Sequence, residues 1–168
     1  AYKGQDKETK VKSITVNQNN PGSSNQVSAS MKISALKNHN FYKVRVRAYS
    51  LNSKNEKIYG VWSSWKYVSP QPDVTKAKNN KSKKGIQINW DKIKGANRYV
   101  VYVSTKKDSG YKKFQTTGKN STTITKYGKN KLKSGKTYYF YVVAQKKVDN
   151  KNQSGAAGNA TKRWSMTY

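Results

Sequence analysis

Apolar and polar residues alternate with one shared spacing in two stretches of the chain. The later stretch reads Leu132-x-x-Gly135-x-x-Tyr138-x-Phe140-x-Val142-x-Ala144, and the earlier one reads Leu36-x-x-His39-x-x-Tyr42-x-Val44-x-Val46-x-Ala48. Apolar residues at every second position indicate a β-strand with one buried face. Because the same pattern occurs twice, we expect a chain built from tandem β modules.

A tyrosine opens each of these strands directly after a turn. Tyr138 and Tyr42 occupy the place of the tyrosine corner of Greek-key sandwiches, in which the hydroxyl ties the turn down. We therefore expect both tyrosines in the structural core, together with Leu132, Leu36 and Phe140.

More short strands are expected in the later half of the chain. They are placed at residues 74–77, 85–90, 99–103, 111–116, 121–125 and 137–145, with a last strand that ends near Trp164. Residues 106–110 favour a hairpin turn, and residues 146–155 are typical of a polar loop. Short strands separated by turn signals every ~8–12 residues predict a β-sandwich, with Trp90 and Tyr99 in its core.

Four residues of the later half, Trp90, Tyr99, Leu132 and Tyr138, have a spacing that resembles fibronectin type III domains. The dipeptide Gly95-Ala96 and the run from Leu132 to Tyr139 are similar to modules strung along secreted proteins of Gram-positive bacteria. The resemblance implies that the tryptophan and the leucine pack in the core. It also implies a fold class that is all-β, with immunoglobulin-like sandwich modules.

Two modules of unequal completeness are expected. Residues 1–69 match only the later part of a module, with strands at 11–16, 27–33, 42–49 and 61–68. Residues 70–73 contain Pro70 and Pro72 and predict a short, stiff linker, and residues 74–168 predict a complete second module. Because the first two strands of the first module have no counterpart, we expect a preceding segment or a second chain to complete it.

The run Trp62-Ser63-Ser64-Trp65 lies on the expected last strand of the first module. It resembles the tryptophan-serine box of cytokine receptor modules without the full spacing of that box. No arginine ladder is evident from the sequence, so the run is interpreted as ordinary strand packing.

The chain is strongly basic, with 35 lysines and arginines, 7 acidic residues and a formal net charge of +28. Such a charge attracts polyanions, and the candidate contacts are the clustered lysines Lys81, Lys83, Lys84, Lys146 and Lys147. Nearly all basic residues are lysine, which favours diffuse attraction over shaped recognition of phosphate. The alternative is that lysine keeps a β-rich surface soluble. Specific binding of nucleic acid is not expected, because the sequence shows no stripe of exposed aromatic residues.

Tyr139 and Tyr141 alternate with Tyr138 and Phe140, so they are expected on the outer face of the sheet. These two tyrosines are the candidate contacts for a carbohydrate or protein ligand.

Residues for catalysis are few. The chain has no cysteine, a single histidine, His39, and carboxylates in polar loops, of which only Asp91 and Asp149 could approach each other. We therefore predict no enzyme activity, no catalytic residue, no metal and no cofactor. No segment approaches the ~18 apolar residues that a membrane helix needs, so membrane insertion is not expected.

These observations predict a non-catalytic spacer and interaction module of a larger secreted or cell-wall-associated bacterial protein. Its partners would be other domains of that protein, and its location extracellular. The alternative function is cell adhesion, with a module that binds an anionic polymer, such as teichoic acid or a sulfated host glycan, through its lysine-rich surface.

Overall fold

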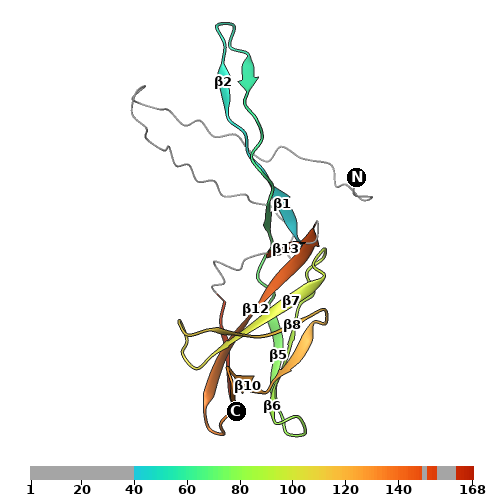
Figure 1. Cartoon of the computed structure of the whole chain (residues 1–168), viewed down its shortest axis with the longest axis vertical. Coiled ribbons are helices and arrows are strands. Elements are labelled where there is room, and N and C mark those ends of the chain that lie inside the picture. The colour runs from blue at the N-terminus through green and yellow to red at the C-terminus, as the bar shows by residue number, and fades with distance from the viewer. Residues whose placement is uncertain (1–39, 149–150, 155–161) are drawn as a thin grey trace. The chain divides into compact units, whose positions relative to one another are not determined.

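A computed structural model describes residues 40–148, 151–154 and 162–168. These residues all belong to one compact unit that spans residues 38–168. The described part contains β-strands in several sheets and no helix, so the expected all-β class is confirmed (Figure 1). The predictions for Leu36, His39 and the strands at 11–16 and 27–33 lie outside the described residues.

The first described elements form an antiparallel ribbon. Strand β1 (Tyr42–Val44) pairs with β4 (Lys66–Val68), and β2 (Tyr49–Leu51) pairs with β3 (Lys57–Tyr59). Between these pairs, the Ser63 amide donates a hydrogen bond to the Val46 carbonyl at 2.8 Å, and the Gly60 amide donates to the Ala48 carbonyl at 3.0 Å. The strands expected at 42–49 and 61–68 are therefore each interrupted, although the two chain segments remain bonded to each other.

The interruption has a simple cause in the register. Val44 lies opposite Lys66, and Tyr49 lies opposite Tyr59, so the returning segment holds two residues more than the outgoing one. Extra residues in one strand of a pair form a bulge, which locally changes which face a side chain takes.

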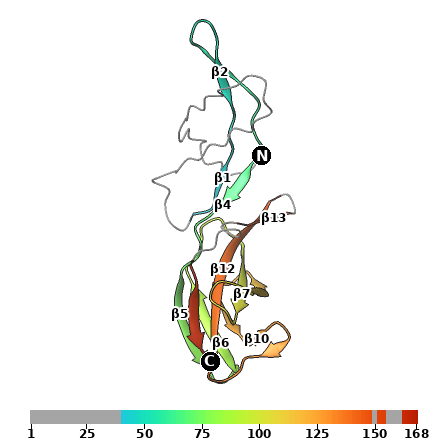
Figure 2. The ribbon, with the colours of Figure 1, turned by 90° about the vertical axis from the view of Figure 1, so that its left-hand side faces the viewer.

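The later residues form two larger sheets. The first contains β5 (Val74–Asn80), β6 (Gly85–Trp90) and β9 (Ser121–Ile124), in that order. The second has the order β13 (Lys151–Ser154), β12 (Thr137–Val148), β7 (Arg98–Ser104) and β8 (Lys112–Thr117), and β14 (Trp164–Thr167) also pairs with β12. The short strands β10 (Lys126–Tyr127) and β11 (Asn130–Lys131) pair with each other (Figure 2).

The core lies between these two sheets and follows the alternation of the strands. In β6 the buried face carries Ile86, Ile88 and Trp90, and in β12 it carries Tyr138, Phe140 and Val142. The Trp90 and Tyr99 rings meet edge to face, with centroids 5.6 Å apart. This arrangement of two sheets over one core is sandwich-like.

The two larger sheets together form what we call the larger body. The structure places five of the predicted core residues in its interior: Trp90, Tyr99, Leu132, Tyr138 and Phe140. Tyr42, the sixth that can be placed, is half-buried, and its hydroxyl accepts a hydrogen bond from the Asn40 side chain at 3.3 Å.

Tyr138 ties down the turn that precedes its strand. Its hydroxyl accepts a hydrogen bond from the Lys133 amide at 2.9 Å, five residues earlier in the chain. Gly135, inside that turn, has φ of +73°, which side-chain-bearing residues rarely adopt, and its amide donates to the Tyr168 carbonyl at 2.7 Å. The geometry is that of a tyrosine corner.

Two strand boundaries in the second half were predicted wrongly. The expected polar loop at 146–155 is partly a hairpin, because β12 continues to Val148 and pairs with β13. Backbone pairing does not require apolar side chains, so the alternation pattern does not detect a hairpin rich in lysine and asparagine. The last strand begins at Trp164, rather than ending there, and runs to Thr167.

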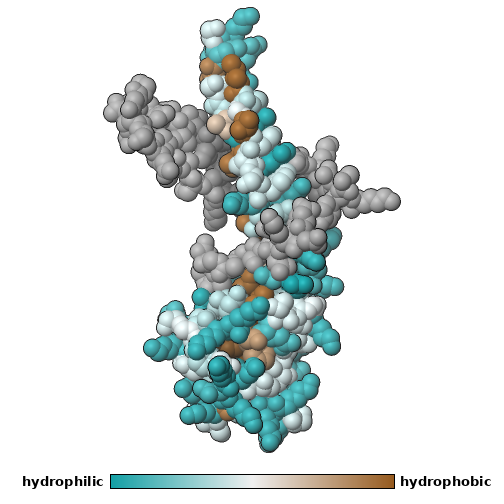
Figure 3. Space-filling view, viewed as in Figure 1, coloured by the Kyte–Doolittle hydropathy of each residue, from teal (hydrophilic) through white to brown (hydrophobic). Residues whose placement is uncertain are grey.

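Large apolar side chains are exposed in the ribbon, whereas those of the two larger sheets are mostly buried. Among the described residues, all the large hydrophobic side chains that are exposed lie between residues 46 and 68: Val46, Leu51, Ile58, Tyr59, Val61, Trp62 and Val68. Figure 3 shows such residues on the surface of the ribbon. Val46 is 67% exposed and Val61 93% exposed, so the apolar face expected from the pattern exists without a cover in the described residues. What completes this module stays a prediction.

Candidate functional site

Positively charged groups and aromatic rings alternate along one face of the ribbon. We call this set the cation–aromatic ladder; it comprises Lys43, Arg45, Arg47, Tyr49, Lys57, Tyr59, Trp62 and Trp65. Its members come from both segments of the ribbon, so each rung is a contact across the antiparallel pair.

Two arginines form the centre of the ladder. The guanidinium carbon of Arg45 lies 4.2 Å from the ring centre of Trp62 and 4.4 Å from that of Trp65. The guanidinium carbon of Arg47 lies 3.6 Å from the ring centre of Tyr59 and 4.4 Å from that of Trp62. Each guanidinium therefore contacts two rings, and Trp62 contacts both guanidinium groups.

Lysines extend the ladder at both ends. The Lys43 ammonium lies 4.2 Å above the Trp65 ring, and the Lys57 ammonium lies 4.4 Å above the Tyr49 ring. The Tyr49 and Tyr59 rings, directly opposite each other in register, have centroids 6.0 Å apart. Cation–π contacts at exposed sites contribute about 0.5–1 kcal/mol each, so several in series stiffen the ribbon.

The interpretation of Trp62 to Trp65 as ordinary strand packing without an arginine ladder is wrong. Residues three positions apart in a regular strand point to opposite faces, so the two tryptophans could not both have faced the arginines. The bulge in the returning segment puts both rings against Arg45. Arg45 and Arg47, two positions apart on the opposite segment, were the signal in the sequence that could have suggested the ladder.

The charge of the ribbon is poorly balanced. Residues 42–68 contain six basic residues and a single acidic one, Glu56, which accepts a hydrogen bond from the Asn52 side chain at 2.8 Å in the turn. Within the described residues, no carboxylate or other hydrogen-bond acceptor binds the guanidinium of Arg47. The N–H groups at its edge can therefore donate hydrogen bonds to an external anion.

A second cluster lies on the outer face of the larger sheet, where Tyr141 was expected. The Tyr141 ring stacks on Tyr102 with centroids 4.9 Å apart and contacts Tyr111 at 4.8 Å. The Arg163 guanidinium carbon lies 4.4 Å from the centre of the Tyr141 ring. Tyr139, the other candidate, is half-buried and pairs in register with Ser104 and Ser165 on its two sides.

Burial raises the pKa values of two tyrosines in this cluster, Tyr141 and Tyr111. Desolvation raises the pKa of the Tyr141 hydroxyl above its ordinary value, Tyr102 raises it further, and Arg163 opposes the shift. Desolvation also raises the pKa of Tyr111. All three rings are half-buried against one another, so the cluster is a packed patch with little free ring surface.

The candidate lysines do not form one surface. Lys81, Lys83 and Lys84 are exposed in the turn between β5 and β6, whereas Lys146 and Lys147 lie near the end of β12 that pairs with β13. Figure 1 shows these two places at opposite ends of the body that contains both sheets. The structure therefore separates the predicted polyanion contacts into two groups.

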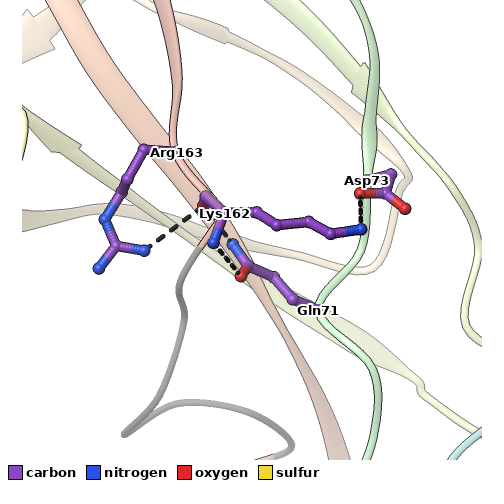
Figure 4. A network of polar contacts seen from close by, with 4 residues as sticks. All are labelled: Gln71, Asp73, Lys162 and Arg163. Atoms are coloured by element: carbon purple, nitrogen blue, oxygen red, sulfur yellow. Dashed lines mark hydrogen bonds and ion pairs between the residues drawn. The ribbon is translucent and has the colours of Figure 1, made fainter.

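The linker after the ribbon is bound to the body by a set of polar contacts (Figure 4). The Gln71 side-chain amide donates to the Lys162 carbonyl at 2.6 Å and accepts from the Lys162 amide at 3.0 Å. The Lys162 ammonium pairs with the Asp73 carboxylate at 2.6 Å, and the Asp91 amide donates to the Asp73 carbonyl at 2.9 Å. Pro72 is fully buried. We call the contacts of Gln71 and Asp73 with Lys162 the linker clasp.

Residues for catalysis or metal binding are sparse in what the structure describes. No group of three or more histidine, cysteine, aspartate or glutamate residues in that part of the chain could hold a metal ion. Asp149, the suggested neighbour of Asp91, lies outside the described residues. In the same part of the chain, no helix is long and apolar enough to cross a membrane.

No protein-family model matches the chain, and no curated protein is significantly similar to it.

Proposed function

We propose that this chain is a non-catalytic spacer and interaction module of a larger secreted or cell-surface bacterial protein. The observation that carries the proposal is the linker clasp. A spacer holds its neighbours at a distance only if the connection between modules resists bending. Here the Gln71 side chain donates a hydrogen bond to the backbone carbonyl of Lys162 and accepts one from its backbone amide. Lys162 lies in the segment that leads into the last strand.

The module type in this proposal is the fibronectin type III domain. Its support is the resemblance at Trp90, Tyr99, Leu132 and Tyr138, together with the edge-to-face pair and the hydrogen bond that ties the turn to Tyr138. A fold of this kind serves many functions, so it is compatible with the spacer role and by itself implies no reaction.

The alternative is an adhesin that binds an anionic polymer through its lysine clusters, and it has weaker support. Lys81, Lys83 and Lys84 are separated from Lys146 and Lys147 by the length of the body. A polymer that contacts both lysine groups at once would have to extend along the whole larger body. These lysines therefore favour diffuse attraction of polyanions over binding at one site.

Hydrogen exchange tests the clasp directly. The Lys162 amide donates to the Gln71 side chain, so its exchange should be protected in the intact protein and accelerate about tenfold in Gln71→Ala, since losing a net hydrogen bond costs about 1 kcal/mol. Gln71→Glu keeps the acceptor and should retain most of this protection. Equal, fast exchange in all three proteins would contradict the proposed role of the linker.

A further inference from the structure

The register of β1 with β4 repeats the register of β12 with β14. Tyr42 lies opposite Val68, as Tyr138 lies opposite Met166, and each tyrosine starts the alternating pattern that the two halves of the chain share. Both pairs also continue into a hairpin, which β2 forms with β3 in the ribbon and β12 forms with β13 in the larger body. The neighbours of β12 therefore indicate which neighbours β1 can take.

On its other edge, β12 has a second neighbour that β1 lacks among the described strands. Strand β7 pairs with β12 there, and Val101 lies opposite Val142 with both side chains fully buried. Val46 stands at the same distance from its tyrosine as Val142 does from Tyr138, yet it is 67% exposed. Within the part of the chain that the structure describes, β1 pairs with β4 alone. The repeat thus indicates that an apolar strand fits beside β1.

The ribbon presents backbone groups along this outer edge. The Val46 carbonyl accepts from the Ser63 amide at 2.8 Å, and the Val46 amide donates to the Ser63 hydroxyl at 3.0 Å. Because successive residues of a strand direct their backbone groups to opposite edges, those of Arg47 point to the outer edge. Phe41, which also alternates with Val46, already donates its amide to the Lys94 carbonyl outside the ribbon at 3.0 Å. An extended chain can therefore pair with this edge.

The outer edge carries cations where β12 carries uncharged side chains. Lys43 and Arg47 correspond by their spacing to Tyr139 and Val143. Within the described residues, neither cation is paired with a carboxylate. Acidic side chains directly across a strand pair would be attracted to these cations, whereas basic ones would be repelled. A fitting strand therefore alternates apolar residues with acidic residues.

We propose that the outer edge of residues 42–48 is a docking site for an extended segment of another polypeptide, in which apolar residues alternate with glutamate or aspartate. The segment runs antiparallel to β1, as β7 runs antiparallel to β12. Its apolar side chains lie beside Val44 and Val46, and its acidic side chains lie beside Lys43 and Arg47. This partner site is independent of the spacer role.

The chain does not itself contain a segment of this chemistry. It has 35 basic residues and 7 acidic ones, so a second copy would bring mainly like charge to the edge. Asp6 and Glu8 are the only acidic residues of the sequence that lie two positions apart, and the residue between them is Lys7. The partner is therefore a different polypeptide.

Two synthetic peptides of equal length and composition are the probes. One has valine and glutamate in strict alternation, and the other has the valines together in one block. Calorimetry of the full chain at about 0.1 M salt limits diffuse electrostatic attraction. We expect the alternating peptide to bind about tenfold more tightly, because only alternation places every apolar side chain on one face of a paired strand. Equal affinity, or no binding of either peptide, would overturn the proposal.

Two pairs of variants locate the site on the ribbon. Val46→Ser removes an apolar contact of the docked strand; its control, Ile58→Ser, changes an exposed residue opposite Ser50, which lies on the same face but beyond the edge. We expect Val46→Ser to weaken binding of the alternating peptide about fivefold and its control by less than about twofold. Arg47→Gln should weaken binding about threefold, whereas Lys54→Gln, in the ribbon turn, makes the same change in net charge with little effect. Equal losses within each pair would overturn the site, and thermal unfolding confirms that each variant is folded.

Hydrogen exchange of the intact protein identifies the occupant without any substitution. The alternating peptide should slow exchange of the Arg47 amide about tenfold and leave exchange of the Val46 amide, which already bonds to Ser63, unchanged. No slowing at Arg47 would overturn pairing at the edge. Protection of the Arg47 amide without peptide would show that the chain itself occupies the edge. If that protection rises with protein concentration, the occupant is a second copy, and either result overturns the proposed partner.

Discussion

Replacing Trp90 tests the core of the larger body most sharply. The side chain is 1% exposed and meets the Tyr99 ring at 5.6 Å, whereas the backbone of Trp90 bonds separately to Asn120. Truncation therefore removes the ring and leaves the strand pairing in place. Trp90→Ala should lower the free energy of unfolding by about 3–5 kcal/mol, of which the aromatic pair accounts for about 0.5–1.5 kcal/mol.

Trp90→Phe separates two contributions to that loss. The indole nitrogen of Trp90 is buried and has no hydrogen-bond partner in the part of the chain that the structure describes. Phenylalanine keeps an aromatic ring beside Tyr99 and removes this unpaired donor, whose burial costs about 1–3 kcal/mol. The smaller ring leaves a gap, so the two effects oppose each other, and the net loss should stay below about 2 kcal/mol.

Urea unfolding of the full chain, followed by circular dichroism, measures both variants. The slope of the free energy against urea should be unchanged, because the surface exposed on unfolding is nearly the same. A loss below about 1 kcal/mol for Trp90→Ala would show that Trp90 is not part of the core. A loss for Trp90→Phe equal to that of Trp90→Ala would refute the role assigned to the unpaired nitrogen.

Three further predictions concern the turn, the ladder and the sheet face. Tyr138→Phe removes the hydroxyl that accepts from the preceding turn and should cost about 1 kcal/mol in urea unfolding; no loss would mean that the turn is held without it. A double-mutant cycle on Arg47→Ala and Trp62→Ala should give a coupling free energy of about 0.5–1 kcal/mol, whereas zero coupling would deny the contact. Because the pKa of Tyr141 in the folded protein lies above its ordinary value of 10.0, the neutral hydroxyl contributes stability that is complete below pH 10 and is lost as the pH rises through the folded pKa. Urea midpoints between about pH 9 and pH 11.5 should therefore fall more steeply for the intact protein than for Tyr141→Phe, and parallel curves would contradict the shift.

The sequence predicts the parts of the fold that depend on apolar alternation. Phe140, Val142 and Trp90 lie in strands whose pattern follows the sheet period, so their buried faces could be read directly. The hairpin between β12 and β13 could not be found in this way, because its lysine and asparagine side chains carry no apolar signal while its backbone still pairs.

The candidate site depends on features that a regular period does not describe. The contact of Arg45 with both Trp62 and Trp65 requires a bulge, and bulges change the face of a residue without leaving a distinct composition. The clasp between Gln71 and Lys162 joins residues far apart in the chain, so local sequence could not indicate it. Tyr141 could be placed on the outer face, but its partners Tyr102, Tyr111 and Arg163 follow only from the assembled sheet.

The central claim, that the chain acts as a stiff spacer, is tested most directly by a distance distribution between spin labels. The chain contains no cysteine, so Lys54→Cys in the ribbon turn and Lys83→Cys in the turn between β5 and β6 introduce the only labelling sites. Electron–electron double resonance should give one narrow distribution, as narrow as that of a control pair at Lys83 and Lys106 within the body, and Gln71→Ala should broaden it. A broad distribution in the intact protein, with a narrow control, would contradict the spacer role.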